Sequence, residues 1–142
     1  MLATDVSDRA VALAAENARA LGLPVEVFEG SLLSPLPPEL RGTIDLVVSN
    51  PPYLTAEEIE TLPPEVKAEP LEALMGDTDV HRRLSVEAAG WLRPGGWLVM
   101  EIGAEQGPEV RALLAGRFAD IEVIRDLAGR ERVIRGRRRH GD

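Results

Sequence analysis

The chain has 142 residues, of which 44% are hydrophobic, enough for one domain with a substantial core. Its formal net charge of −8 and isoelectric point near 4.8 argue against a stable nucleic-acid partner. It has no cysteine, which excludes disulfides, thiolate metal sites and cysteine nucleophiles, and no long apolar run or signal-like start, so a cytoplasmic protein without a membrane partner is expected.

Apolar spacing predicts alternating strands and helices along most of the chain. The expected elements, in chain order, are a strand ending at Asp5, a helix over 8–21, a strand over 25–28, a proline-rich loop over 30–42, a buried strand over 44–48, a lid-like segment over 55–79, a helix over 80–91, a strand over 97–102, a helix over 110–118, and strands over 121–124 and 133–134. The order favours an α/β fold with a mostly parallel sheet and an antiparallel final hairpin. The basic stretch 135–140 is expected to be a solvated tail.

The stretch Ser49-Asn50-Pro51-Pro52-Tyr53 follows the buried strand and is the strongest candidate for chemistry. Two prolines end the strand and hold the loop rigid at the carboxyl edge of the sheet, where open α/β sheets bind ligands. The side-chain carbonyl of Asn50 and the backbone carbonyl of Pro51 are two fixed acceptors, suited to both hydrogens of a substrate –NH2 group. Tyr53 adds an aromatic face. The alternative is a simple strand-to-loop turn.

Asp5 lies between a strand and a helix, where nucleotide-binding α/β folds place the acid that binds ribose hydroxyls. A carboxylate suits this role because it accepts two hydroxyl hydrogen bonds at once. The alternative, equally favoured by the local sequence, is an acid that caps the following helix. The glycine-rich turn expected before such an acid does not occur in this chain.

A further pattern extends over six segments of the chain. They are 3–7 (Ala-Thr-Asp-Val-Ser), 49–53 (Ser-Asn-Pro-Pro-Tyr), 69–74 (Glu-Pro-Leu-Glu-Ala-Leu), 92–97 (Leu-Arg-Pro-Gly-Gly-Trp), 101–107 (Glu-Ile-Gly with Gln-Gly) and 126–132 (Asp-Leu-Ala-Gly-Arg-Glu-Arg). In these segments the chain resembles the HemK (PrmC) family. Those enzymes use S-adenosyl-L-methionine to methylate the glutamine of the Gly-Gly-Gln motif in peptide-chain release factors.

The resemblance implies a Rossmann-like methyltransferase fold and a role for each matching residue. Asn50 and Pro51 would hold the glutamine amide, with Asn50 also beside the cofactor. Pro52 and Tyr53 would line the substrate pocket. In the cofactor site, Asp5 would bind the ribose, Val6 would pack near the adenine, and Ser31 stands where the family usually has an acid. No metal is implied.

The resemblance also leads to expectations about the extent of the chain. Residues 1–142 would be one partial catalytic domain, truncated at its N-terminus, without the family's substrate-recognition domain, first strand and glycine-rich loop. Such a chain is expected to bind the cofactor poorly, to be poorly active or inactive, and to associate with itself. Two alternatives remain: a nucleic-acid amino methyltransferase acting on adenine-N6 or guanine-N2, and an inactive α/β fragment that only associates.

Overall fold

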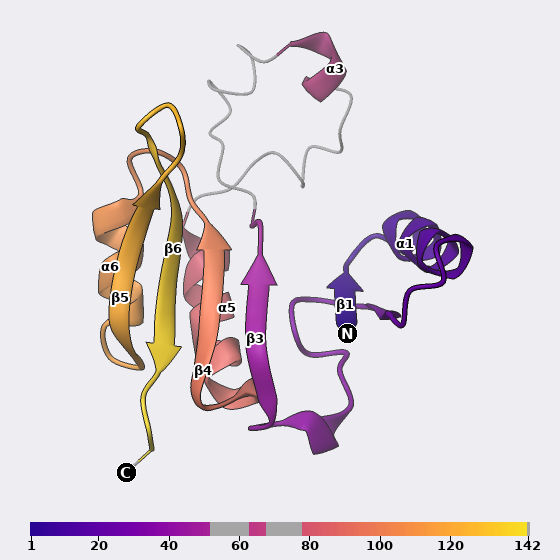
Figure 1. The fold of residues 1–142 in the computed structure, drawn as a ribbon, viewed down its shortest axis with the longest axis horizontal. Helices are drawn as coiled ribbons and strands as arrows, with labels where there is room; N and C mark the ends of the chain where they lie inside the picture. Colours follow the sequence, from indigo (N-terminus) through magenta and orange to yellow (C-terminus); the bar gives the residue numbers. More distant parts are fainter. Residues whose placement is uncertain (52–62, 68–77, 142) are drawn as a thin grey trace. The chain divides into compact units, whose positions relative to one another are not determined.

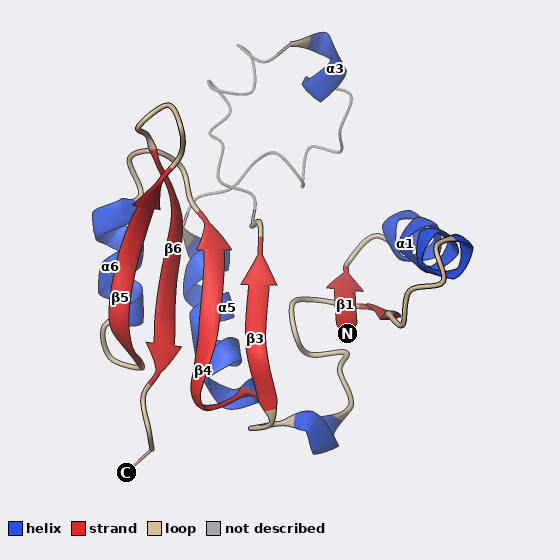
Figure 2. Cartoon of the chain, in the orientation of Figure 1, coloured by secondary structure: helices blue, strands red, loops and turns tan. Residues whose placement is uncertain are grey.

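The computed structural model describes residues 1–51, 63–67 and 78–141, which fall into two compact units over residues 1–41 and 42–142 (Figure 1). The alternation of strands and helices confirms the predicted α/β class (Figure 2). The first unit contains β1 (Leu2–Asp5), α1 (Asp8–Ala20), β2 (Glu26–Glu29) and the 3-10 helix η1 (Pro38–Leu40). The second contains β3 (Ile44–Ser49), α3 (Pro64–Lys67), α5 (Asp79–Trp91), β4 (Leu92–Glu101), α6 (Gly107–Leu114), β5 (Phe118–Arg125) and β6 (Glu131–Arg138).

In the first unit, β1 and β2 pair in parallel and α1 connects them, so that Asp5 lies opposite Glu29 at the carboxyl edge. Both ends of α1 carry residue types that favour the end of a helix. The hydroxyl of Ser7 caps the helix by accepting a hydrogen bond of 3.2 Å from the backbone of Ala10. Gly22 follows the helix with a φ of +65°, a conformation that glycine adopts without strain.

The second unit is built on a four-stranded sheet with the order β3-β4-β6-β5. β3 and β4 are parallel, whereas β6 is antiparallel to both β4 and β5, which confirms the predicted final hairpin. Helices α5 and α6 cover one face of this sheet (Figure 2). The core between helices and sheet consists of fully buried side chains, among them Leu84, Trp91, Leu98, Met100, Val110, Leu114, Phe118 and Ile134.

Burial in β4 and β3 alternates along the chain, as it does when one face of a sheet is covered. Leu98 and Met100 of β4 are completely buried, but in β3 only Val47 is buried, and Leu46 and Val48 are 53% and 67% exposed. The predicted burial of this whole strand on both faces is therefore wrong. Helices α5 and α6 cover one face of this sheet, and β3 is one of its two outer strands rather than a central one.

Two boundaries near the C-terminus also differ from prediction. Phe118, expected in a helix, begins β5, because α6 ends at Leu114 and a turn follows it. Residues 135–138 of the expected solvated tail instead form the second half of β6, which lies between β4 and β5. Arg135 and Arg137 pair with carboxylates across the hairpin, so the sheet accommodates a sequence that looks like a charged tail. None of the helices in the described ranges is long and apolar enough to cross a membrane.

Candidate functional site

Asp5 ends β1 with an exposed side chain. Its Oδ1 accepts a hydrogen bond of 2.8 Å from the backbone of Ser7, which holds the carboxylate in one orientation. Ser7, not Asp5, caps α1, so the alternative of a capping acid fails. Because the backbone donor uses one carboxylate oxygen, the other keeps its acceptor capacity for hydroxyl groups. Next to it, Val6 leaves 62% of its side chain exposed, an apolar surface directly beside the carboxylate.

Ser31 is held close to Asp5 by the backbone between β2 and η1. The amide of Gly30 donates a hydrogen bond of 2.9 Å to the carbonyl of Asp5, which places Ser31 one residue beyond that contact. The hydroxyl of Thr4 then bonds the carbonyl of Leu32 at 2.5 Å, from the other side of the same loop. A side chain at position 30 would collide with the ring of Pro35, so only glycine allows this approach. The first unit therefore gathers Asp5, Val6 and Ser31 at one edge.

Asn50 and Pro51 follow the carboxyl end of β3, as predicted. Ser49 pairs with Met100 of the parallel strand β4, so Asn50 lies at the level where β4 also ends. Asn50 is exposed and Pro51 is buried. The proline thus fixes the turn while the amide of Asn50 faces outward, with no hydrogen bond to another described residue. Pro52 and Tyr53 lie outside the described residues, as does the segment 69–74 that contributes to the family resemblance.

The loop that follows β4, beside the end of β3, is closed by two hydrogen bonds between Gly103 and Gln106. The side chain of Gln106 accepts a hydrogen bond of 2.8 Å from the backbone of Gly103, and the backbone of Gln106 returns one of 3.0 Å to the carbonyl of Gly103. These bonds account for the pattern Glu-Ile-Gly followed by Gln, since the glutamine folds the loop back at the start of α6. These bonds fix the loop that leaves the carboxyl end of β4, the strand paired with β3.

His81 was not predicted from the sequence to support the site. This residue is completely buried in the first turn of α5, and its Nε2 lies 2.9 Å from the carbonyl oxygen of Glu101, the last residue of β4. Its Nδ1 has no hydrogen-bond partner among the described residues, so Nε2 carries the proton and donates it to the carbonyl. The sequence contained one signal for its burial. His81 precedes Leu84 and Ser85 at helical spacing, which places all three on the buried face of α5. His81 ties the start of α5 to the edge that carries Asn50.

The segment 126–132 forms the turn of the β5–β6 hairpin and is structural. Oδ1 of Asp126 accepts hydrogen bonds from the backbones of Ala128 and Arg130, at 2.9 and 3.0 Å. The hydrogen bond from the Arg130 backbone, supported by that of Ala128 and by the charge of Arg132, lowers the pKa of Asp126 below its ordinary value near 3.8. Gly129 takes the positive φ of +80° that the turn requires.

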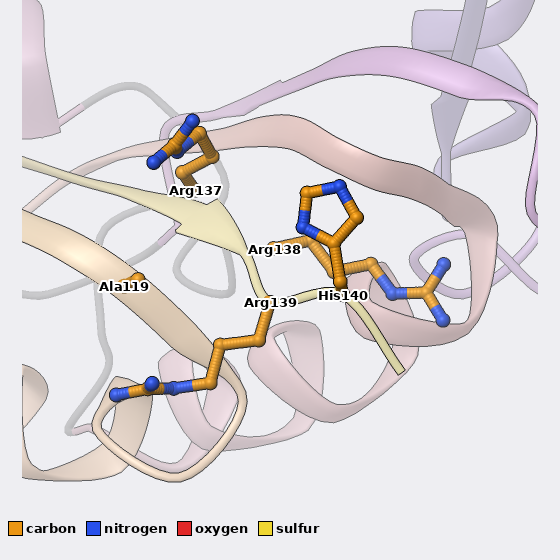
Figure 3. Close-up of a pocket in the computed structure, with 5 residues that line it drawn as sticks. All are labelled: Ala119, Arg137, Arg138, Arg139 and His140. Carbon is orange, nitrogen blue, oxygen red and sulfur yellow. The ribbon is translucent and has the colours of Figure 1, made fainter. Parts of the chain in front are cut away.

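The predicted site residues therefore form two groups. Asp5, Val6 and Ser31 belong to the first unit, and Asn50 and Pro51 to the second. A separate open hollow lies at the far end of β6 and is lined by Ala119 and by Arg137, Arg138, Arg139 and His140 (Figure 3). No cluster of three or more metal-ligating side chains exists among the described residues.

Comparison with known proteins identifies the relatives of this chain. A family profile described as "Methyltransferase small domain" matches residues 1–64. The chain is 43% identical over 145 residues to the release factor glutamine methyltransferase of Moorella thermoacetica, and 44% identical over 142 residues to that of Deinococcus radiodurans. These alignments cover 96% and 98% of this chain. The chain is thus similar, over nearly all of its length, to proteins named release factor glutamine methyltransferase. It spans about half the length of these curated relatives, 50% of each.

Two solved structures support the fold of this chain. The ribosomal protein L11 methylase of Lactobacillus delbrueckii subsp. bulgaricus matches with a TM-score of 0.63 and 24% identity, over 98% of this chain and 57% of that one. The Thermus thermophilus 16S rRNA N2 G1207 methyltransferase, solved with AdoMet and guanosine, matches with a TM-score of 0.68 and 19% identity, over 97% of this chain and 31% of that one. Both confirm the predicted Rossmann-like methyltransferase fold, and the family resemblance seen in the sequence is confirmed by the curated relatives.

Proposed function

We propose that this protein transfers a methyl group from S-adenosyl-L-methionine to the side-chain amide nitrogen of glutamine in the Gly-Gly-Gln motif of peptide-chain release factors. The observation that carries the proposal is the 38–44% identity, over nearly the whole chain, to proteins named release factor glutamine methyltransferase. The protein substrate is accordingly a release factor, and the compartment is the cytoplasm, where release factors work.

The arrangement around Asn50 supports an amide as the methyl acceptor. An amide nitrogen is a poor nucleophile because its lone pair is delocalised into the carbonyl. The side-chain oxygen of Asn50 and the backbone oxygen of Pro51 each accept one of its two hydrogens, which favours positive charge developing on that nitrogen. The same pair of bonds fixes the direction of the lone pair toward the methyl donor. Pro52 and Tyr53 complete the substrate pocket in this proposal.

The first unit offers the groups that a nucleoside requires. The free oxygen of Asp5 fits ribose hydroxyls, the exposed side chain of Val6 fits the edge of an adenine ring, and Ser31 supplies a hydroxyl near the adenine amino group. S-adenosyl-L-methionine, when bound, supplies an electrophilic methyl group on a sulfonium. No covalent intermediate on the protein is needed, since the task of Asn50 and Pro51 is to position and polarise the acceptor.

The test is methyl transfer from radiolabelled S-adenosyl-L-methionine to a release factor by the whole protein. Matched acceptors are the unmodified release factor and one in which the glutamine of the Gly-Gly-Gln motif is replaced by asparagine. The proposal expects label only in the first, because the shorter side chain does not bring its nitrogen to Asn50 and Pro51. Equal labelling of both acceptors, or label that enters only RNA, would show that the acceptor has been assigned wrongly.

A further inference from the structure

The arginines of this chain are concentrated at its C-terminal end. Residues 111–141 contain nine arginines and four acidic residues, a formal charge of +5, whereas the remaining residues sum to −13. The total of −8 is therefore the sum of two regions of opposite sign. The net charge of the whole chain therefore does not exclude nucleic-acid binding at the β5–β6 hairpin, because a partner meets the local charge.

The four acids of this region are all engaged with arginines. The ion pairs are Arg125–Glu131 at 3.7 Å, Arg132–Asp126 at 3.6 Å, Arg135–Glu122 at 2.5 Å and Arg137–Asp120 at 2.5 Å. The nearest acid of β3, Asp45, is likewise paired with Arg93 at 2.6 Å. The other five arginines of this region form no ion pair with a described carboxylate, although the charge of Arg130 also helps to lower the pKa of Asp126.

Three of these five arginines lie where β6 ends and β5 begins, and with His140 we call them the basic cluster: Arg117, Arg138, Arg139 and His140. The backbone of Arg139 donates a hydrogen bond of 3.0 Å to the carbonyl of Arg117, which places these two residues side by side. Within the cluster, the guanidinium contacts of Arg138 and Arg139 go to neutral carbonyl oxygens, those of Leu92 and Ala115 respectively. Figure 3 shows the side chains of Arg138, Arg139 and His140 fanning out around the hollow.

We propose that the basic cluster binds the phosphate backbone of a nucleic acid. Guanidinium groups match phosphate oxygens in geometry, and several of them on neighbouring elements can contact successive phosphates of one strand. A protein partner would need an apolar centre to its interface. No large exposed hydrophobic side chain occurs in the described part of residues 111–123 or 130–141; those nearest in the sequence, Ile124 and Leu127, belong to the other end of the hairpin.

The basic cluster is distinct from the site around Asn50. Arg137, which precedes Arg138 of the cluster, lies opposite Trp97 near the start of the apolar part of β4. Asn50 instead follows Ser49, which lies opposite Met100 toward the end of β4. The two sites therefore occupy opposite ends of the same sheet. The bound nucleic acid is a docking partner rather than the methyl acceptor, and the inference holds whether or not the proposed methyl transfer is correct.

The test uses the chain as it is, titrated against a fluorescein-labelled RNA hairpin and a DNA duplex of the same length, by fluorescence anisotropy at several salt concentrations. The variant is Arg117→Gln with Arg139→Gln. Its matched control is Arg9→Gln with Arg19→Gln on the exposed surface of α1, which changes the net charge equally. Circular dichroism and melting curves establish that both variants stay folded.

The cluster variant is expected to weaken binding and to reduce the slope of log K against log salt by about 0.7–0.9 for each arginine removed, while the control retains the parent slope. Tighter binding of RNA than of DNA, or the reverse, identifies which nucleic acid the cluster prefers. The proposal is overturned if the parent binds neither probe, if both variants lose affinity equally, or if polyglutamate competes as well as the nucleic acid at equal charge.

Discussion

Replacement of Asn50 by alanine tests the proposed acceptor site most sharply. Asn50 is exposed and makes no hydrogen bond to another described residue, so its loss should leave the fold and the melting temperature nearly unchanged. In the transition state it would supply one of two acceptors for the amide hydrogens. Loss of one such preorganised hydrogen bond costs about 2–4 kcal/mol, which is about a 30- to 900-fold slower methyl transfer.

The assay is single-turnover methyl transfer to a release factor with the cofactor saturating, together with calorimetric titration of the cofactor. The matched control is Asn17→Ala, which removes the other asparagine of the chain from an exposed position on α1. The control should retain the parent rate. Cofactor affinity should be largely intact in Asn50→Ala. If affinity falls as much as the rate does, or if the rate changes less than about threefold, the role given to Asn50 is wrong.

Four further predictions concern other residues. Asp5→Ala should weaken cofactor binding by about 10- to 160-fold, the equivalent of about 1.5–3 kcal/mol for hydrogen bonds to a charged group, as measured by calorimetry; unchanged affinity would remove Asp5 from the ribose site. Because the folded-state pKa of Asp126 is lowered, this residue contributes stability above its ordinary pKa near 3.8 that is lost as the pH falls through the lower folded-state value. Melting curves over this acid range should therefore depend less on pH in Asp126→Asn, and identical pH profiles would contradict the assignment. Leu46→Lys with Val48→Lys should reduce concentration-dependent light scattering, since these side chains are 53% and 67% exposed on an outer strand; scattering as strong as that of the parent would rule out this face as a self-association surface. Leu98→Ala should lower the free energy of unfolding by about 2–5 kcal/mol in a denaturant titration, because Leu98 is fully buried, and a loss below about 1 kcal/mol would mean that the core is misplaced.

Local signals in the sequence were sufficient for much of the fold. Apolar spacing predicted α1 to within one residue at its end, and the residues that delimit it, Ser7 and Gly22, each satisfy a backbone requirement of that helix alone. The final hairpin followed from its short connection, whose geometry depends on Asp126 and Gly129 within the turn itself. Features of this kind depend on neighbours in the sequence and can be predicted without knowledge of the tertiary structure.

What the sequence did not predict depends on residues distant along the chain. The stretch 135–140 has the composition of a solvated tail, yet Arg135 and Arg137 are held in β6 by Glu122 and Asp120 on the neighbouring strand. Arg135 also lies over the ring of Trp97, with 5.1 Å to its centroid. The exposure of one face of β3 could not be predicted from the sequence either, because an apolar strand has the same sequence pattern whether one or both of its faces are covered.

The candidate site shows the same division. The residue types at Asp5 and Asn50 followed from their positions after strands, and the structure places both at carboxyl edges. The contacts that hold the carboxyl edge of β4 in place could not be predicted in this way. His81 reaches Glu101 across 20 residues of sequence, and only the packing of α5 against β4 reveals this contact.

The most direct test of the account is to locate the transferred methyl group by mass spectrometry. A release factor incubated with the whole protein and S-adenosyl-L-methionine is digested, and the peptide that contains the Gly-Gly-Gln motif is fragmented. The account predicts a single added methyl group on the side-chain nitrogen of that glutamine, present with the parent protein and nearly absent with Asn50→Ala. A methyl group on any other residue, or an equal yield from the Asn50→Ala protein, would contradict it.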